Sequence, residues 1–204
     1  MTRLFIIRHG ETLWNREKRA QGAKDIALTD NGKLQGEYLA KRLVKEKIDY
    51  IYSSDLSRAY ETAKLLADKF NKPVLAIPEL REMNFGLWEG LTMNDIQLKF
   101  QDHFNSWRSS PHKAQIPEAE TLLQVQERAL KAVFNIIDKH PNKSIAMVSH
   151  GVTIKTIILG LLDIDLSNYR KIRQDNTGIN IIDFKENQWV LVQLNDTCHL
   201  TNIK

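Results

Sequence analysis

The feature that most constrains the fold is a repeated alternation of short apolar runs with segments of helical period. Each run is short and carries no charged residue, which is typical of strands buried on both faces of a parallel sheet. Between the runs, apolar residues recur every three or four positions, as on one face of a helix. This β–α order predicts an α/β fold with a mostly parallel sheet and helices on both faces.

Two further runs near the C-terminus flank the polar segment Lys185-Glu186-Asn187. This pattern predicts a hairpin, and therefore an antiparallel edge to the sheet. The strands expected from the sequence are Leu4–Ile7, Tyr50–Ser53, Val74–Ile77, Ile145–Ser149, Gly178–Phe184 and Trp189–Leu194.

Helices are expected between the strands. Thr29 and Asp30 offer N-cap chemistry to the first of them. The spacing of Ile96, Phe100, Phe104 and Trp107 predicts one helix within a segment that is otherwise mostly loop. We expect residues 88–120 to form a cover over the functional site. The remaining helices are expected over the apolar faces that begin at Leu56, Leu122 and Val152.

The composition is that of one globular unit. The chain has 204 residues, of which 42% are hydrophobic and 26% charged, so intrinsic disorder is excluded as a description of the whole. That length suffices for one self-sufficient core. Because there is no repeat, low-complexity tract or linker, we expect a single domain over residues 1–204.

The sequence favours a cytoplasmic protein. Cys198 is the only cysteine, which excludes an internal disulfide or a Cys-rich zinc site and fits a reducing compartment. The N-terminal apolar run is too short for a signal peptide. The most apolar stretch, Ile154–Leu162, contains Lys155 and is followed by Asp163, so it is expected to be a buried helix and no membrane span.

The charge distribution gives no sign of a nucleic-acid partner. Lys and Arg number 29 against 25 Asp and Glu, a net charge of +4. Basic residues alternate with acidic ones, as in Lys45-Glu46-Lys47, and form no long run. A solvated surface of mixed sign is therefore expected. The sequence leaves the oligomeric state open.

Chemically capable side chains follow the four parallel strands. Arg8 and His9 follow the first, Arg58 the second, Glu82 the third and His150 the fourth. In open α/β sheets, ligands bind beyond the carboxyl ends of the strands. We therefore expect these five side chains to converge at one edge of the sheet.

This set of side chains suits a phosphate ester. Arginine forks bind phosphate oxygens, and a neutral imidazole can attack phosphorus to form a covalent intermediate. A second histidine can donate to the phosphoryl oxygens, and a carboxyl group can protonate the leaving alkoxide. Because the reaction mainly needs positioning and charge neutralisation, no metal is required. Gly10 and Gly151 would let backbone N–H groups approach the phosphate, and a helix after His150 would point its positive end at the anion.

The order Arg8-His9-Gly10-Glu11-Thr12, followed by Trp14-Asn15, closely resembles the histidine phosphatase superfamily of phosphoglycerate mutase-like proteins. The resemblance runs through the whole chain and implies a three-layer α/β/α sandwich. The other motifs in family order are Gln21-Gly22, Leu28-Thr29 with Gly32, Ser53-Ser54 with Arg58-Ala59 and Thr62-Ala63, Leu80-Arg81-Glu82, Gly86 with Trp88-Glu89-Gly90, and Ser149-His150-Gly151.

By that resemblance, His9 would be the residue phosphorylated and Glu82 the proton donor. Arg8, Arg58 and His150 would complete the phosphate pocket. No cofactor and no metal are implied. The further positions implied to bind substrate or phosphate are Asn15, Gln21, Gly22 and Gly151.

The chain departs from the glycolytic mutases of that family. It has no insert before the long helix, no extended C-terminal tail and no arginine pair for a second anionic group. It resembles the shorter broad-specificity or metabolite phosphatases instead. Ala119 stands where many relatives carry glycine, so we assign no role to Glu120. Substrate specificity is expected to lie in residues 88–120 and 173–178, and the substrate itself is not indicated.

The leading hypothesis is a metal-independent phosphomonoester hydrolase that acts on small phosphorylated metabolites through a phosphohistidine at His9. A phosphoglycerate mutase-type isomerase would use the same residues but return the phosphoryl group to its substrate, and the short chain argues against its full lid. A non-catalytic module that binds phosphorylated ligands needs neither His9 nor Glu82. A zinc site at His9, His150 and Glu82 is disfavoured because two neighbouring arginines would repel the ion.

Overall fold

The backbone forms one mixed sheet with helices on both faces. Its strands are β1 (Thr2–Arg8), β2 (Tyr50–Ser53), β3 (Val74–Ala76), β4 (Ser144–Ser149), β5 (Ile179–Lys185) and β6 (Gln188–Asp196). The computed structural model describes residues 1–201, and within them the strand order is β3-β2-β4-β1-β5-β6. The first four strands in that order pair in parallel, whereas β5 and β6 extend the sheet from β1 as an antiparallel edge.

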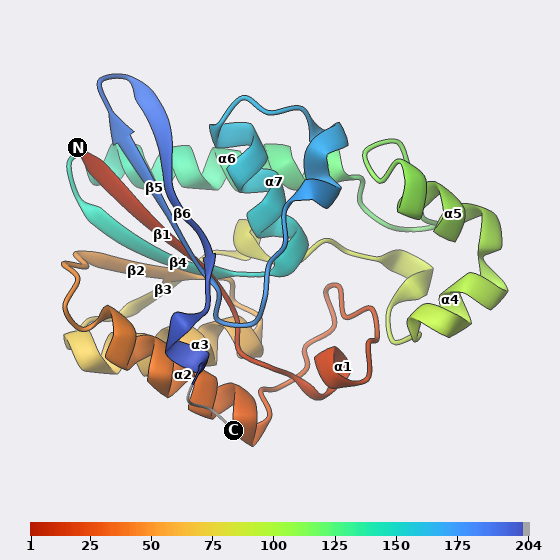
Figure 1. Cartoon of the computed structure of the whole chain (residues 1–204), viewed down its shortest axis with the longest axis horizontal. Coiled ribbons are helices and arrows are strands. Elements are labelled where there is room, and N and C mark those ends of the chain that lie inside the picture. Colours follow the sequence, from red (N-terminus) through yellow and green to blue (C-terminus); the bar gives the residue numbers. More distant parts are fainter. Residues whose placement is uncertain (202–204) are drawn as a thin grey trace.

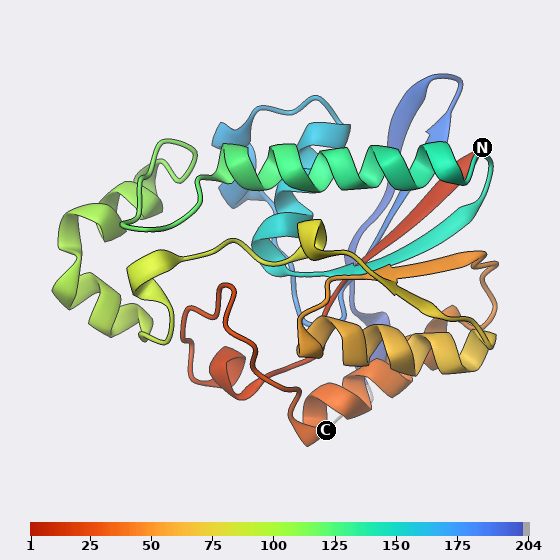
Figure 2. The ribbon, with the colours of Figure 1, turned by 180° about the vertical axis from the view of Figure 1, so that it is seen from behind.

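Helices cover both faces of the sheet and extend beyond one of its edges. They are α1 (Leu13–Arg16), α2 (Asp30–Leu43), α3 (Ser57–Phe70), α4 (Met93–Lys99), α5 (Gln101–Ser109), α6 (Leu122–Lys139) and α7 (Gly151–Leu161), with short 3-10 segments η1 (Pro78–Leu80), η2 (Gly86–Trp88), η3 (Leu166–Lys171) and η4 (Cys198–Leu200). Figures 1 and 2 show α2 and α3 on one side of the sheet and α6 and α7 on the other. The predicted three-layer α/β/α sandwich with an antiparallel edge is therefore confirmed.

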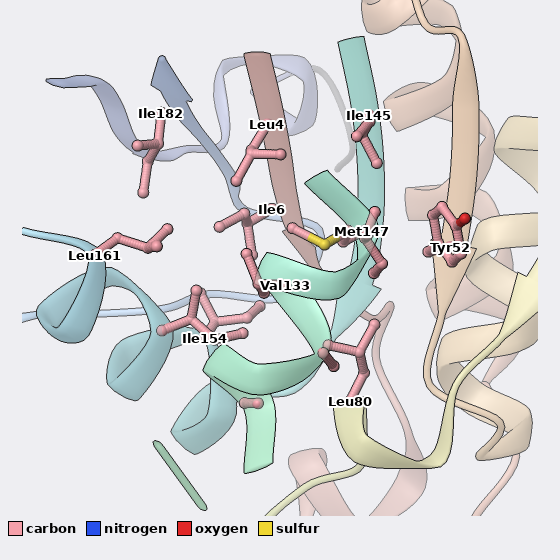
Figure 3. Packing of buried hydrophobic residues seen from close by; sticks show 14 of the residues in the cluster. Leu4, Ile6, Tyr52, Leu80, Val133, Ile145, Met147, Ile154, Leu161 and Ile182 are labelled. Atoms are coloured by element: carbon pink, nitrogen blue, oxygen red, sulfur yellow. The ribbon is translucent and has the colours of Figure 1, made fainter. Parts of the chain in front are cut away.

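The core lies on both faces of the central strands. Leu4 and Ile6 of β1 belong to the apolar cluster under α6 and α7, and Phe5 and Ile7 to the cluster over α2 and α3. Figure 3 shows the first cluster, where Ile154 of α7 approaches the strand. Burying such a side chain contributes about 1.5–3 kcal/mol. A strand buried on both faces explains the uninterrupted apolar run in the sequence.

One predicted helix is wrong in its extent. The segment that contains Ile96, Phe100, Phe104 and Trp107 forms two helices, because Phe100 leaves helical geometry at φ −134° and ψ 44°. A straight helix over residues 96–107 would be about 18 Å long. The break instead lets these side chains pack around one apolar cluster with Trp88. Figure 1 shows α4 and α5 beyond the sheet, on the same side as α1.

The most apolar helix, α7, is a core helix as expected. Its Ile154, Ile157 and Leu161 are buried in the cluster against β1 and β4. In the part of the chain that the structure describes, no helix combines the length and hydropathy needed to cross a bilayer.

The segment after β1 packs backbone to backbone on α2. A Cβ atom added to Gly10 would collide with the carbonyl oxygen of Gly32, and one added to Gly32 would collide with that of Glu11. The Gly10 N–H donates to the Thr62 hydroxyl at 3.0 Å. The expectation that Gly10 offers its N–H to a ligand is therefore wrong, because this glycine serves close packing.

We predict that Gly32→Ala destabilises the fold by about 1–3 kcal/mol, because a methyl group must displace backbone atoms. Gly36→Ala on the same helix is the matched control. Its Cβ would meet only the end of the Leu65 side chain, and alanine favours the helix by up to about 1 kcal/mol. Urea unfolding of both variants measures the difference, and equal stability of the two would contradict this account.

Candidate active site

The pairing of β1 with β4 brings two histidines together. In this parallel register Arg8 lies opposite Ser149, so the next residues, His9 and His150, leave the sheet side by side. The His9 N–H donates to the Ser149 carbonyl at 3.0 Å. The two imidazole centroids are 5.1 Å apart.

A cavity of about 280 Å³ opens at this edge of the sheet. His150 is not part of its wall and is fully buried beside His9. The other eight predicted site residues all line the cavity: Arg8, His9, Asn15, Gln21, Gly22, Arg58, Glu82 and Gly151.

His9 is held as a neutral imidazole. Its Nδ1 lies 2.7 Å from the Gly10 carbonyl oxygen. Because a carbonyl only accepts, Nδ1 carries the proton and Nε2 keeps its lone pair. Burial, together with the charges of Arg58 and Arg8, lowers the pKa of His9 well below its usual range. Burial and the same arginines also hold the pKa of His150 well below that range.

The loop before α2 fixes Arg58 at the start of α3. Leu56 provides no side-chain cap, but the Asp25 carboxylate accepts from the backbone N–H and hydroxyl of Ser57 at 2.8 and 2.7 Å. This bond ties the loop to the helix end. The loop carbonyls of Gly22 and Lys24 then accept from the fully buried guanidinium of Arg58, at 2.9 and 2.7 Å.

Arg58 remains protonated although its side chain is buried. Desolvation lowers its pKa to about 10, while the charge of Glu82 opposes that shift. The guanidinium therefore stays protonated at neutral pH. A buried cation of this kind is compensated best by an anion in the cavity, which is consistent with a phosphate ligand.

Glu82 lies at the N-terminus of α7. Its carboxylate accepts from the backbone N–H groups of Val152 at 3.1 Å and Thr153 at 3.2 Å, and from that of Met83 at 3.0 Å. A carboxylate is favoured at this end of a helix dipole. The expectation that the start of α7 points at the ligand therefore needs correction, because Glu82 occupies two of its N–H groups.

Arg128 of α6 holds the segment that carries Glu82. Its guanidinium donates to the carbonyl oxygens of Glu79, Arg81 and Glu82 at 2.7–3.1 Å and pairs with Glu120 at 2.7 Å. Glu120 also accepts from the Asn84 N–H at 2.8 Å. Glu120 and Arg128 thus fix the backbone position from which the Glu82 side chain reaches the cavity.

Several buried polar atoms at the site have no hydrogen-bond partner within residues 1–201. They are Arg8 Nε, Gln21 Oε1, Arg58 Nε, Trp88 Nε1 and both ring nitrogens of His150. Buried polar groups are normally paired. Their concentration at this cavity indicates a polar ligand.

Gly22 lies where two loops meet beside the cavity, the loop before α2 and the segment that contains Phe85 and Glu89. Its φ of +55° lies in the left-handed region, and a Cβ atom would collide with the Glu89 carboxylate. That carboxylate accepts from the N–H groups of Ala23 at 2.7 Å and Phe85 at 3.1 Å. A glycine is therefore required at position 22 for this loop contact.

Ten of the eighteen residues that line the cavity were not among the predicted site residues. Trp88, Met93 and Trp107 come from the segment 88–120, and Gln174 comes from 173–178, the two segments expected to set specificity. Lys155, a charged residue inside the apolar α7, was a further signal in the sequence. The other wall residues outside the prediction are Arg19, Ala20, Phe85, Val152 and Tyr169.

A metal-binding arrangement is not found at the site. Within the described residues no group of three or more His, Cys, Asp or Glu side chains is placed to hold a metal ion. The guanidinium groups of Arg8 and Arg58, the neutral imidazole of His9 and the carboxylate of Glu82 line one cavity at the carboxyl edge of the sheet. Together the fold and the site define an enzyme that transfers phosphoryl groups.

Comparison with known proteins places the chain more narrowly. The model of the histidine phosphatase superfamily (branch 1) matches residues 4–197. Phosphoserine phosphatase 1 of Hydrogenobacter thermophilus is 34% identical, and the match covers 98% of this chain and 95% of that protein.

Solved structures agree with that match. A mutant phosphoserine phosphatase from Entamoeba histolytica, in complex with phosphoserine, superposes with a TM-score of 0.89 at 35% identity and covers 98% of this chain and 100% of its own. Bacillus stearothermophilus YhfR gives a TM-score of 0.93 at 33% identity with the same coverage. The chain belongs to the histidine phosphatase superfamily. It is a phosphoric monoester hydrolase, a phosphatase of small phosphorylated metabolites.

The neutral histidines make stability depend on pH. Unfolded histidine protonates near pH 6.5, whereas folded His9 and His150 have a much lower pKa. The unfolded state therefore binds more protons below about pH 6.5, and stability falls as the pH drops through that value. Each histidine adds a slope of about 1.4 kcal/mol per pH unit once its unfolded form is protonated.

We predict that His150→Gln removes about 1 kcal/mol per pH unit of this slope between about pH 5 and 6. Urea unfolding at several pH values measures it. His103→Gln, which changes an exposed histidine of α5, is the control and keeps the wild-type slope. A His150→Gln slope equal to that of wild type would mean that His150 is not neutral in the fold.

Proposed function

We propose that this phosphatase works without a metal ion and forms a phosphohistidine at His9, with Glu82 as the proton donor. The observation that carries the proposal is the neutral imidazole of His9, which is oriented through its Nδ1–H and lines the same cavity as Arg8 and Arg58. A nucleophile of this kind needs an available lone pair and a site that attracts the phosphate.

In the first step, the phosphate dianion lies between Arg8 and Arg58. The Nε2 lone pair of His9 attacks phosphorus and the bond to the leaving oxygen breaks, while protonated Glu82 gives its proton to that oxygen. The two guanidinium groups and one ring N–H of His150 neutralise charge on the equatorial oxygens. Support comes from the proximity of these groups, in particular from the Nε atoms of both arginines, which have no hydrogen-bond partner within residues 1–201.

In the second step, water replaces the leaving alcohol. The Glu82 carboxylate takes a proton from water, the oxygen attacks phosphorus, and the bond to His9 breaks. Inorganic phosphate leaves, and Glu82 ends protonated for the next cycle. The N–H groups of α7 donate to the Glu82 carboxylate, so this side chain has a defined position while it is anionic, between the two steps.

We further propose that residues 88–120 cover the cavity during this chemistry. Support comes from the contribution of Trp88, Met93 and Trp107 to its wall. We also assign the enzyme to the cytoplasm and to small-molecule substrates only, because its single cysteine is free and exposed and its surface charge is mixed. Cell fractionation with an antibody tests the location.

We predict that His9→Ala lowers phosphate release from p-nitrophenyl phosphate by about a thousandfold or more, because the nucleophile is lost. His103→Ala, at an exposed position on α5, is the matched control and keeps wild-type activity. Acid-labile labelling of the wild type by radioactive substrate, absent from His9→Ala, accompanies the loss. Activity of His9→Ala within tenfold of wild type would remove the mechanism.

A chelator separates this mechanism from a metal-dependent one. We expect the rate in excess EDTA to stay within twofold of the untreated rate, since two guanidinium groups supply the positive charge. Loss of activity that added divalent metal restores would contradict the proposal.

Incubation with 3-phosphoglycerate and a bisphosphate primer distinguishes hydrolysis from isomerisation. Hydrolysis releases free phosphate, whereas a mutase accumulates the positional isomer. A binding module would give neither product and no labelled enzyme. Isomer accumulation in excess of free phosphate would overturn the assignment as a hydrolase.

A further inference from the structure

One of the cations that line the cavity neither binds the phosphate in the proposed function nor pairs with another residue described in the structure. The described lining residues of the cavity include Arg8, Arg19, Arg58 and Lys155. Arg8 and Arg58 serve the phosphate in the proposed function. Arg19 pairs with Glu17 and donates to a backbone carbonyl at 2.9 Å. Lys155 forms no ion pair or hydrogen bond with any of residues 1–201, so its charge is available to a ligand.

The helix directs Lys155 toward the phosphate-binding groups. Gly151 and Lys155 are four residues apart on α7 and therefore lie on the same face. A Cβ atom on Gly151 would lie 3.6 Å from Arg8 Nε and 3.8 Å from Glu82 Oε2, so this face looks at the phosphate site. Helical side chains lean toward the N-terminus of their helix. Lys155 therefore lies on the face of α7 that looks at the phosphate site, and like Gly151 it lines the cavity.

Aromatic packing holds the lysine in this place. Its Nζ lies 4.5 Å from the ring centroid of the buried Tyr169, within the range of a cation–π contact. Trp107 packs against the same ring, with centroids 5.8 Å apart. Burial lowers the pKa of Lys155 to about 8, and the charge of Arg8 adds to that effect. An anion beside the ammonium would relieve this cost.

We propose that Lys155 binds a carboxylate on the leaving group, so that the preferred substrates are phosphate monoesters of short hydroxy acids. This inference rests on the proposed function, which places the phosphoryl group at His9. About 6 Å along the helix axis separates Gly151 from Lys155, and a leaving group with two carbons between its ester oxygen and carboxylate bridges that distance. A single ammonium matches one carboxylate, whereas a second phosphate is better held by arginine forks.

Two phosphate esters that differ only by a carboxylate test the proposal. O-phosphoserine carries it, and O-phosphoethanolamine lacks it. We expect the wild type to prefer O-phosphoserine by at least about tenfold in kcat/KM. Lys155→Met keeps most of the stem that packs on Tyr169 but removes the charge. It should lower kcat/KM for O-phosphoserine by about ten- to a hundredfold, mainly through KM, and bring the preference near unity.

Two further variants complete the experiment. Lys155→Arg retains a cation and should keep most of the preference, which a purely structural role of the lysine would not require. Lys131→Met changes an exposed lysine on α6, outside the cavity wall, and should leave the preference unchanged. Thermal unfolding checks that each variant is folded.

The wild type alone also decides the question. It should prefer 3-phosphoglycerate to glycerol 3-phosphate for the same reason, so a Lys155→Met variant that fails to fold does not remove the test. Equal use of both members of each pair by the wild type, or an unchanged preference in folded Lys155→Met, would overturn the carboxylate proposal. In either case His9-dependent hydrolysis of p-nitrophenyl phosphate would still stand. If the wild type hydrolyses no ester at all, the proposed function and this inference both fail.

Discussion

The site depends on the hydrogen-bonded register between two neighbouring parallel strands. Opposing Arg8 to Ser149 forces His9 and His150 into adjacent positions as each strand ends. A shift of one residue would turn every side chain of β1 to the other face of the sheet. Leu4 and Ile6 would then exchange clusters with Phe5 and Ile7, so the burial of both faces fixes the register. The same strand register therefore determines both the packing of the core and the placement of the two histidines.

The electrostatics of the site follow from what surrounds those two rings. Arginines and burial together make protonated imidazole unfavourable, which leaves a lone pair free to react. Arg58 remains a cation because backbone carbonyls and the nearby Glu82 support it. This arrangement is costly in the free protein, since several buried polar atoms have no partner within residues 1–201. A phosphate ester brings negative charge and hydrogen-bond acceptors to these groups. The free energy that their burial costs in the free protein therefore favours binding of that ligand over others.

Much of this arrangement was predictable, because the chemically capable residues directly follow strands that the apolar runs reveal. Other features depend on tertiary packing that no local pattern encodes. The break at Phe100 arises from the packing of α4 and α5 around one cluster, although the helical spacing continues through it. Gly10 looks like a ligand-facing glycine until its contact with Gly32 is seen. Lys155 stood out as a charge in an apolar helix, but the cavity wall it joins is completed by Tyr169, whose position depends on the path of the chain after α7.

The central claim is that the phosphoryl group passes through a covalent bond to His9 on its way to water. The stereochemical course at phosphorus, followed with a substrate made chiral by oxygen isotopes, tests that claim most directly. Two successive in-line displacements each invert the configuration, so the account predicts net retention in the released phosphate. Net inversion would show a single direct attack by water and would contradict it.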